Sequence, residues 1–123
     1  MNNPEISEKT KQRIYAMPFS SVYPLYIQKA ERKGRKKEEV DTLIRWLTGY
    51  TDGEIRKHLD ENTCFEAFFH GAENYNENAH KITGMICGYR IEEIEDGIIR
   101  KVRQMDKLID ELARGKTIEQ IMR

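Results

Sequence analysis

The sequence predicts an all-α fold: a small multihelical domain of about six helices, with one helix largely surrounded by the others. Apolar side chains recur at three- and four-residue spacing along most of the chain. Hydroxyl residues suited to helix starts and glycines suited to helix ends separate these stretches. No stretch has the clear alternation of apolar and polar residues that a half-buried strand would need.

A chain of 123 residues has the usual length of one domain. We expect residues 1–17 to form an N-terminal arm and residues 18–123 a single helical domain. The arm is polar and has few apolar anchors, so it should be loosely attached, with at most a short helical turn around Ser7–Tyr15.

Two helices are expected in the first third of the domain. The first would be capped by Ser20 or Ser21 and stop at Gly34. Its segment Val22–Ile27 is apolar on nearly all sides, as in a helix enclosed by neighbours. The second would end at Gly49, where a left-handed cap is wanted. Its buried stripe would consist of Val40, Leu43, Ile44 and Leu47.

Two capping boxes predict two short helices after this. Thr51 with Glu54, and Thr63 with Glu66, can each pair a hydroxyl and a carboxylate with the free N–H groups of a helix start. The second helix would carry an aromatic cluster into the core, made of Phe65, Phe68 and Phe69.

The stretch from residue 72 to residue 89 is harder to assign. Residues 72–80 are rich in Asn and Glu without periodicity, so we expect a long loop. For residues 82–89 a helix is favoured over a strand, because Gly84 and Gly88 lie four apart and would form a smooth face for close packing.

The clearest helix runs from about Asp96 to Arg114 and ends at Gly115. Its expected buried stripe is Ile98, Ile99, Val102, Met105, Ile109 and Leu112. Its expected ion pairs are Asp96 with Arg100, Lys107 with Glu111, and Asp110 with Arg114. Thr117 and Gln120 should cap one last helical turn.

Composition favours a cytoplasmic protein. The 21 basic and 21 acidic side chains cancel, so no net field attracts nucleic acid or a membrane. The two cysteines have no metal or disulfide spacing, and no apolar run approaches the roughly 20 residues of a membrane span. We therefore expect no metal, no cofactor and no membrane contact.

One basic segment, residues 29–37, is a candidate anion-binding site, for a nucleic acid or a phosphate ligand. The simpler interpretation is favoured: cations near a helix C-terminus offset its dipole and face water. The candidate residues are Lys29, Arg32, Lys33, Arg35 and Lys36, with Arg45 and Arg90 as additional contacts.

An enzyme is a further hypothesis, with a site assembled only by the fold. No phosphate loop, nucleophile elbow or metalloprotease motif is present, so no catalytic residue is assigned. Residues that such a site would draw on are Tyr26, His58, Arg90 and Asp106.

The leading hypothesis is a non-catalytic interaction module whose partner is unknown. The helical pattern is complete without any recognisable catalytic constellation. Self-association would use whichever face the short C-terminal turn and the Phe65–Phe69 cluster leave uncovered.

Four segments of the chain carry a resemblance to a known family: Phe19–Arg35, Glu39–Tyr50, Ile82–Asp96 and Asp106–Lys116. They resemble a bacterial family of uncharacterised proteins, domain of unknown function 2200, over about residues 16–123. Two features depart from the family pattern: Gly97 stands where members often carry proline, and the N-terminal arm is longer. The family implies a small multihelical fold with one surrounded helix, and no activity, cofactor or site.

Overall fold

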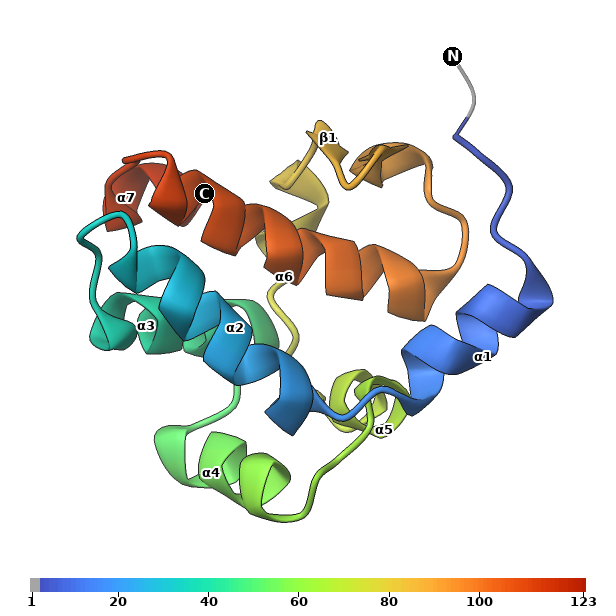
Figure 1. Cartoon of the computed structure of the whole chain (residues 1–123), viewed down its shortest axis with the longest axis horizontal. Coiled ribbons are helices and arrows are strands. Elements are labelled where there is room, and N and C mark those ends of the chain that lie inside the picture. Colours follow the sequence, from blue (N-terminus) through green and yellow to red (C-terminus); the bar gives the residue numbers. More distant parts are fainter. Residues whose placement is uncertain (1–2) are drawn as a thin grey trace.

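The computed structural model describes residues 3–123 and confirms the all-α class (Figure 1). Within these residues there are seven α-helices, two 3-10 helices and one small hairpin. In chain order they are α1 (Glu8–Ala16), α2 (Phe19–Glu31), α3 (Lys37–Thr48), α4 (Asp52–Asp60), α5 (Phe65–His70), η1 (Glu77–Lys81), β1 (Met85–Ile86), β2 (Tyr89–Arg90), η2 (Ile91–Glu93), α6 (Gly97–Ala113) and α7 (Ile118–Ile121).

The longest helix, α6, is the centre of the fold. It crosses the molecule in Figure 1 and contacts α1, α2, α3, α5, α7, η2 and β1. Asp96 caps its start by accepting from the Ile99 N–H at 2.9 Å. The expectation that Val22–Ile27 would be the enclosed segment is wrong, because Leu25 in α2 is 59% exposed.

The core is built around an aromatic cluster beside α6. The ring of Phe68 stacks on that of Phe19 with centroids 4.3 Å apart, and it meets Phe69 edge-on. These rings and that of Phe65 are almost completely buried, as the sequence predicted. The cluster is therefore part of the core, and self-association through another face stays a prediction.

Tyrosine hydroxyls tie the helices together. Three of them each donate to an aspartate: Tyr15 to Asp96, Tyr23 to Asp41, and Tyr26 to Asp106. The first of these bonds joins α1 to the start of α6, and α1 also packs against α5. The helical turn predicted near Ser7 is present as α1. The bond from Tyr15 to Asp96 joins residues 81 positions apart, so local sequence patterns could not predict it.

Most predicted helix ends are confirmed. Gly49 adopts the left-handed conformation with φ of 76°, and the Thr51 and Thr117 capping boxes both form. The predicted cap of α2 is wrong: the helix starts at Phe19, after Pro18. The hydroxyl of Ser21 donates to the Pro18 carbonyl at 2.7 Å, so it is used inside the first turn.

The Thr63–Glu66 capping box does not form. Helix α5 instead begins after Cys64, one residue later than predicted. The Thr63 hydroxyl contacts the His58 imidazole at 3.0 Å, so this side chain faces α4 and is not available to the start of α5.

The predicted helix over residues 82–89 is wrong. Met85–Ile86 pairs with Tyr89–Arg90 in an antiparallel hairpin. Gly84, Cys87 and Gly88 all have positive φ, at 101°, 51° and 82°, and three such residues within five cannot continue a right-handed helix. The turn at Cys87 and Gly88 matches the two-residue hairpin turns that need positive φ at both positions.

Two smaller expectations also need correction. The loop predicted over residues 72–80 contains most of η1, because Asn76 caps this helix by accepting from the Asn78 N–H at 2.8 Å. Of the three ion pairs expected on α6, only Asp110 with Arg114 forms, at 2.9 Å. The others fail because Asp96, Lys107 and Glu111 bond to different partners. Among residues 3–123, no helix combines the length and apolarity that crossing a membrane requires.

Candidate functional site

The seven predicted anion-binding cations do not gather into one site. Four of them form ion pairs: Lys29 with Asp110 at 3.2 Å, Arg35 with Glu39 at 2.7 Å, Arg45 with Asp52 at 2.6 Å, and Arg90 with Glu93 at 4.0 Å. Arg32, Lys33 and Lys36 are exposed at the turn between α2 and α3 and form no ion pair within the described chain. Phosphate binding at this turn stays a prediction.

Arg35 has a structural role, because it links two parts of the fold. Its guanidinium donates to the backbone carbonyls of Leu112 at 3.0 Å and Lys116 at 2.7 Å. These carbonyls belong to the end of α6 and the turn after it, where helix carbonyls lack partners of their own. Arg35 therefore joins the α2–α3 turn to the C-terminal end of α6.

The residues proposed for a fold-assembled enzyme come together only in part. Tyr26 donates to Asp106 at 2.5 Å, and Arg103 reaches the same carboxylate at 3.0 Å. Burial and the Asp106 carboxylate hold the pKa of Tyr26 well above its ordinary value, so this hydroxyl stays protonated. His58 packs between Tyr50 and Phe68 instead.

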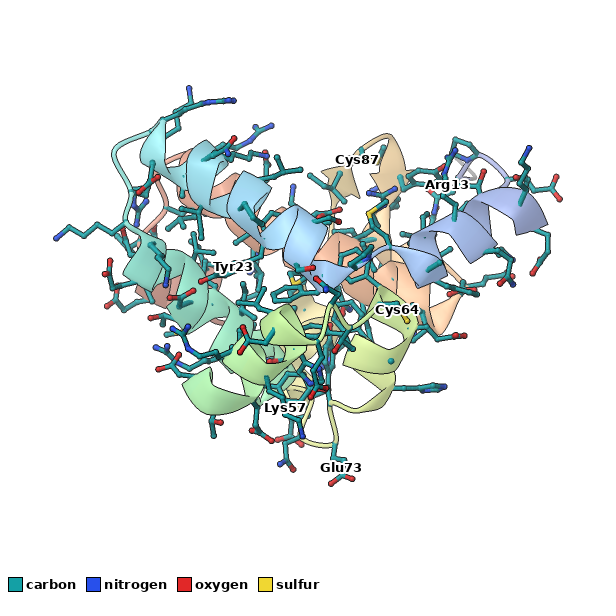
Figure 2. All side chains as sticks on the ribbon, turned by 60° about the horizontal axis from the view of Figure 1, so that its bottom comes forward. Arg13, Tyr23, Lys57, Cys64, Glu73 and Cys87 are labelled. Atoms are coloured by element: carbon teal, nitrogen blue, oxygen red, sulfur yellow. The ribbon has the colours of Figure 1, made fainter. Side chains whose placement is uncertain are left out.

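The remaining candidates for chemistry are dispersed. Arg90 lies on β2, on the hairpin. Both cysteines are free thiols. Figure 2 shows Cys64 beside α5 and Cys87 on the hairpin turn, well apart from each other.

His58 makes the stability of the fold depend on pH. Burial lowers its pKa, which Glu61 and Glu54 oppose and Lys57 reinforces. The unfolded chain therefore binds this proton more readily, and stability should fall as the pH drops below about 6.5, the ordinary pKa of histidine. Urea unfolding between pH 8 and pH 5 should show a shallower loss of stability in His58→Gln than in the wild type. The exposed-site control His70→Gln should keep the wild-type profile, and an unchanged profile in His58→Gln would contradict the assignment.

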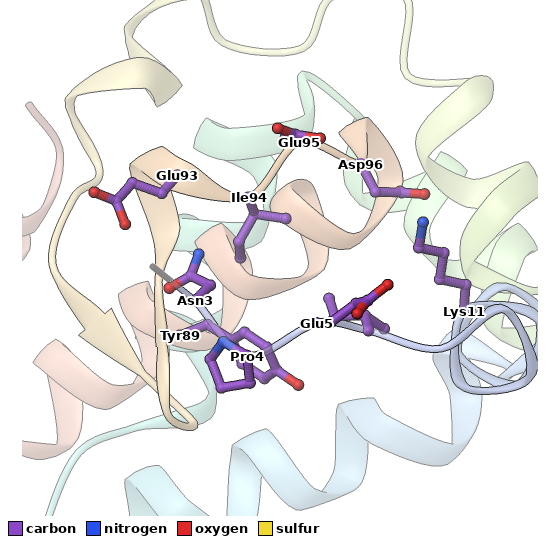
Figure 3. A pocket seen from close by; sticks show the side chains of 10 residues that line it. Asn3, Pro4, Glu5, Lys11, Tyr89, Glu93, Ile94, Glu95 and Asp96 are labelled. Atoms are coloured by element: carbon purple, nitrogen blue, oxygen red, sulfur yellow. The ribbon is translucent and has the colours of Figure 1, made fainter. Parts of the chain in front are cut away.

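One depression, of about 730 Å³, lies between the N-terminal arm and the start of α6 (Figure 3). Four carboxylates and Lys11 line it, and the side chain of Lys11 reaches toward Asp96. Two of its four acidic groups already have partners: Asp96 caps α6 and accepts from Tyr15, while Glu93 pairs with Arg90. We do not assign the functional site to this depression.

A second depression, of about 360 Å³, lies between the two 3-10 helices and α6 and is the better candidate. We call it the α6 pocket; its lining includes Tyr75, Ile82, Ile91, Arg100, Lys101 and Gln104. The exposed residues His80 and Glu92 complete the lining. Its volume lies within the range of small-molecule sites, roughly 300–1,000 Å³.

The wall formed by Tyr75 is held by a chain of hydrogen bonds. Asn76, the next residue, binds the end of α3: its N–H donates to the Leu47 carbonyl at 2.8 Å, and its amide donates to the Trp46 carbonyl at 3.0 Å. Tyr75 then donates to Gln104 at 2.5 Å, and Gln104 donates to the Ala79 carbonyl at 3.2 Å. The pocket wall is thus fixed on two sides.

The α6 side of the pocket is cationic. Arg100 and Lys101 lie four and three residues before Gln104, so both side chains neighbour Gln104 on the helix surface. The ammonium of Lys101 lies 4.7 Å from the centre of the Tyr75 ring, a cation–π contact. Arg100 donates to the Ile94 carbonyl at 2.9 Å. Neither cation forms an ion pair with any residue from 3 to 123.

Electrostatics keep Tyr75 as a donor. Burial raises its pKa far above the ordinary value, and the nearby charge of Arg100 offsets this only partly. Its proton therefore stays on the hydroxyl and in the bond to Gln104. The sequence did not indicate this site, because Arg100 and Lys101 match the pattern of the solvated face of an amphipathic helix. Tyr75 lies in the loop expected over residues 72–80, where no contact with α6 was predicted.

The described residues thus form a small all-α protein with a cation-lined depression of ligand size beside its central helix. The chain belongs to the family DUF2200, described as an uncharacterized protein conserved in bacteria, whose model matches residues 13–123. This match contains the whole α6 pocket but not the arm residues of the larger depression.

A solved structure is similar over nearly the whole chain. It is titled crystal structure of uncharacterized protein SP1917, and it is 42% identical in sequence with a TM-score of 0.85. The similarity covers 97% of this chain and 94% of that one. A search of curated proteins found no match.

Proposed function

We propose that this protein is a non-catalytic binding module that takes an anionic ligand in the α6 pocket. The observation that carries the proposal is the placement of Lys101 over the Tyr75 ring, with Arg100 next to it in the pocket lining. Neither of these two cations forms an ion pair with a carboxylate of the described chain.

The tyrosine hydroxyls of this fold serve to join its helices, which supports a role without catalysis. The hydrogen bond to Asp96 and burial raise the pKa of Tyr15 to about 12, and burial with the bond to Asp41 raises that of Tyr23. Such hydroxyls hold helices together and do not exchange protons near neutral pH. In the α6 pocket, Tyr75 and Gln104 are likewise engaged with each other, which supports binding and not proton transfer.

Benzenesulfonate, a small aromatic monoanion, tests the proposal. In a ¹⁵N-labelled NMR titration, amide shifts should concentrate at the α6 pocket, near Tyr75, Ile82 and Ile91. Lys101→Gln should weaken the affinity about tenfold, since a hydrogen bond to a charged group contributes roughly 1.5–3 kcal/mol.

Arg114→Gln is the matched control. It removes one positive charge from the last turn of the same helix, at a side chain that is mostly exposed and outside the pocket. Its affinity for benzenesulfonate should equal that of the wild type. Shifts centred elsewhere, or equal affinities for Lys101→Gln and Arg114→Gln, would exclude the α6 pocket as the binding site.

A further inference from the structure

We infer that the ligand of the α6 pocket is a small monocarboxylate that carries an apolar body. This inference rests on the proposed function, because it concerns the same pocket, and it goes further by naming the class of ligand. It follows from three properties of the pocket: the free edge of one guanidinium, the net charge of the lining, and the size and apolarity of the interior.

The guanidinium of Arg100 offers a two-donor fork. One terminal nitrogen, Nη1, is engaged with the Ile94 carbonyl at 2.9 Å, which fixes the plane of the group. The Nε and Nη2 groups make no hydrogen bond to residues 3–123 and are not sealed off from solvent. Two parallel N–H groups on one edge match the two oxygens of a carboxylate.

The charge of the lining matches a single negative charge. Arg100 and Lys101 are positive and Glu92 is negative, so these three groups carry a net charge of +1. Hydrogen bonds from its own backbone N–H and from the Gly84 N–H, the latter at 3.1 Å, lower the pKa of the Glu92 carboxyl and hold it in place. A fixed carboxylate beside the site disfavours a dianion such as a phosphate monoester.

The interior suits a compact apolar group. Ile82 and Ile91 are almost completely buried behind the lining, and the half-buried Tyr75 ring supplies the apolar surface that a ligand can contact. With about 30 Å³ per non-hydrogen atom, as in liquid water, the 360 Å³ would hold roughly a dozen atoms. A chain polymer or a dinucleotide is far too large, whereas a phenyl or branched aliphatic group with a short acid arm fits.

Three probes that share one phenyl body separate these requirements. They are 3-phenylpropionate, its neutral alcohol 3-phenylpropan-1-ol, and phenyl phosphate, which is mainly a dianion at pH 7.5. Calorimetric or NMR titration of the full chain should give an affinity for the acid at least tenfold higher than for either of the others. The alcohol gives the affinity that the phenyl group contributes without a charge. Phenyl phosphate gives the loss of affinity caused by a second negative charge.

Variants then test the fork. Arg100→Lys keeps the charge but removes the paired donors, so it should weaken 3-phenylpropionate about tenfold while changing benzenesulfonate by less than threefold. Arg114→Lys is the matched control and should bind both probes as the wild type does. Thermal unfolding of each variant checks that it still folds. Because Arg100→Lys also loses the hydrogen bond to the Ile94 carbonyl, Lys101→Gln serves as a second variant. Lys101→Gln should lower the affinity for both 3-phenylpropionate and benzenesulfonate.

The outcomes distinguish this inference from the proposed function. If phenyl phosphate or the alcohol binds as tightly as the acid, or if Arg100→Lys keeps full affinity for the acid, the ligand is not a monocarboxylate, although benzenesulfonate binding would still support an anion pocket. If neither benzenesulfonate nor 3-phenylpropionate shifts the pocket amides at millimolar concentration, the proposed function and this inference both fail.

Discussion

Replacing Phe68 with alanine should lower the free energy of unfolding by about 3–5 kcal/mol. Its ring is fully buried and contacts those of Phe19, Tyr50, His58 and Phe69. The loss combines the burial of apolar surface with an unfilled cavity, because the neighbouring rings are held by α2, α4 and α5 and cannot all move inward. Urea unfolding should show the change directly, and the midpoint of thermal unfolding should fall by roughly 10–25 °C.

Leu25→Ala is the control for this prediction. It also removes a large apolar side chain, but from an exposed position on α2. Its effect should stay within about 0.5 kcal/mol of zero. Equal losses in Phe68→Ala and Leu25→Ala would mean that the aromatic cluster does not form the core of the folded state.

Replacing Gly49 with alanine should be the second most damaging change, because two costs add at this position. The left-handed conformation of Gly49, with φ of 76°, costs a residue with a Cβ atom about 1–2 kcal/mol. A methyl group would also collide with the backbone oxygen of Asn74 and come within 2.8 Å of the Asn74 Cβ. Overpacking of this kind costs about another 1–3 kcal/mol.

Gly34 provides a close control for Gly49. It has the same φ of 76°, but a Cβ atom there would meet nothing within 4 Å. Gly34→Ala should therefore show only the conformational cost, of about 1–2 kcal/mol. The difference between the two variants in free energy of unfolding, measured by chemical denaturation, gives the cost of the clash between the end of α3 and the loop after α5. If both variants lose the same stability, that approach does not constrain the fold.

Most of the helical structure could be predicted from the sequence because its signals are local. The stripe from Ile99 to Leu112, the glycine after α3 and the Thr51 box each depend on residues within a few positions of one another. Such signals can be recognised without knowing which other parts of the chain pack against them. They fail at Thr63, whose hydroxyl had a second partner, His58, on another helix.

The hairpin could not be predicted because its pattern is ambiguous. Gly84 and Gly88, four residues apart, suit a close-packed helix face as well as two positive-φ turns. What decides between them is the backbone ladder of Met85 with Arg90, supported by the Lys107 side chain, which donates to the Met85 carbonyl at 3.0 Å. That contact comes from α6, more than twenty residues away.

The candidate site was missed for a related reason. Arg100 and Lys101 follow the rule for the polar face of a helix, and nothing near them in sequence indicates that an aromatic ring will cover that face. Tyr75 reaches them only because Asn76 ties its segment to the end of α3. Charge patterns in the sequence instead pointed to residues 29–37, where several cations are already neutralised.

The central position of α6 also has a consequence for how the chain is made. Helices α1, α2, α3 and α5 all pack on α6, which begins at Gly97, so during synthesis none of them can complete its packing until the residues of α6 have left the ribosome. The helices made earlier should therefore stay only marginally stable until α6 is available.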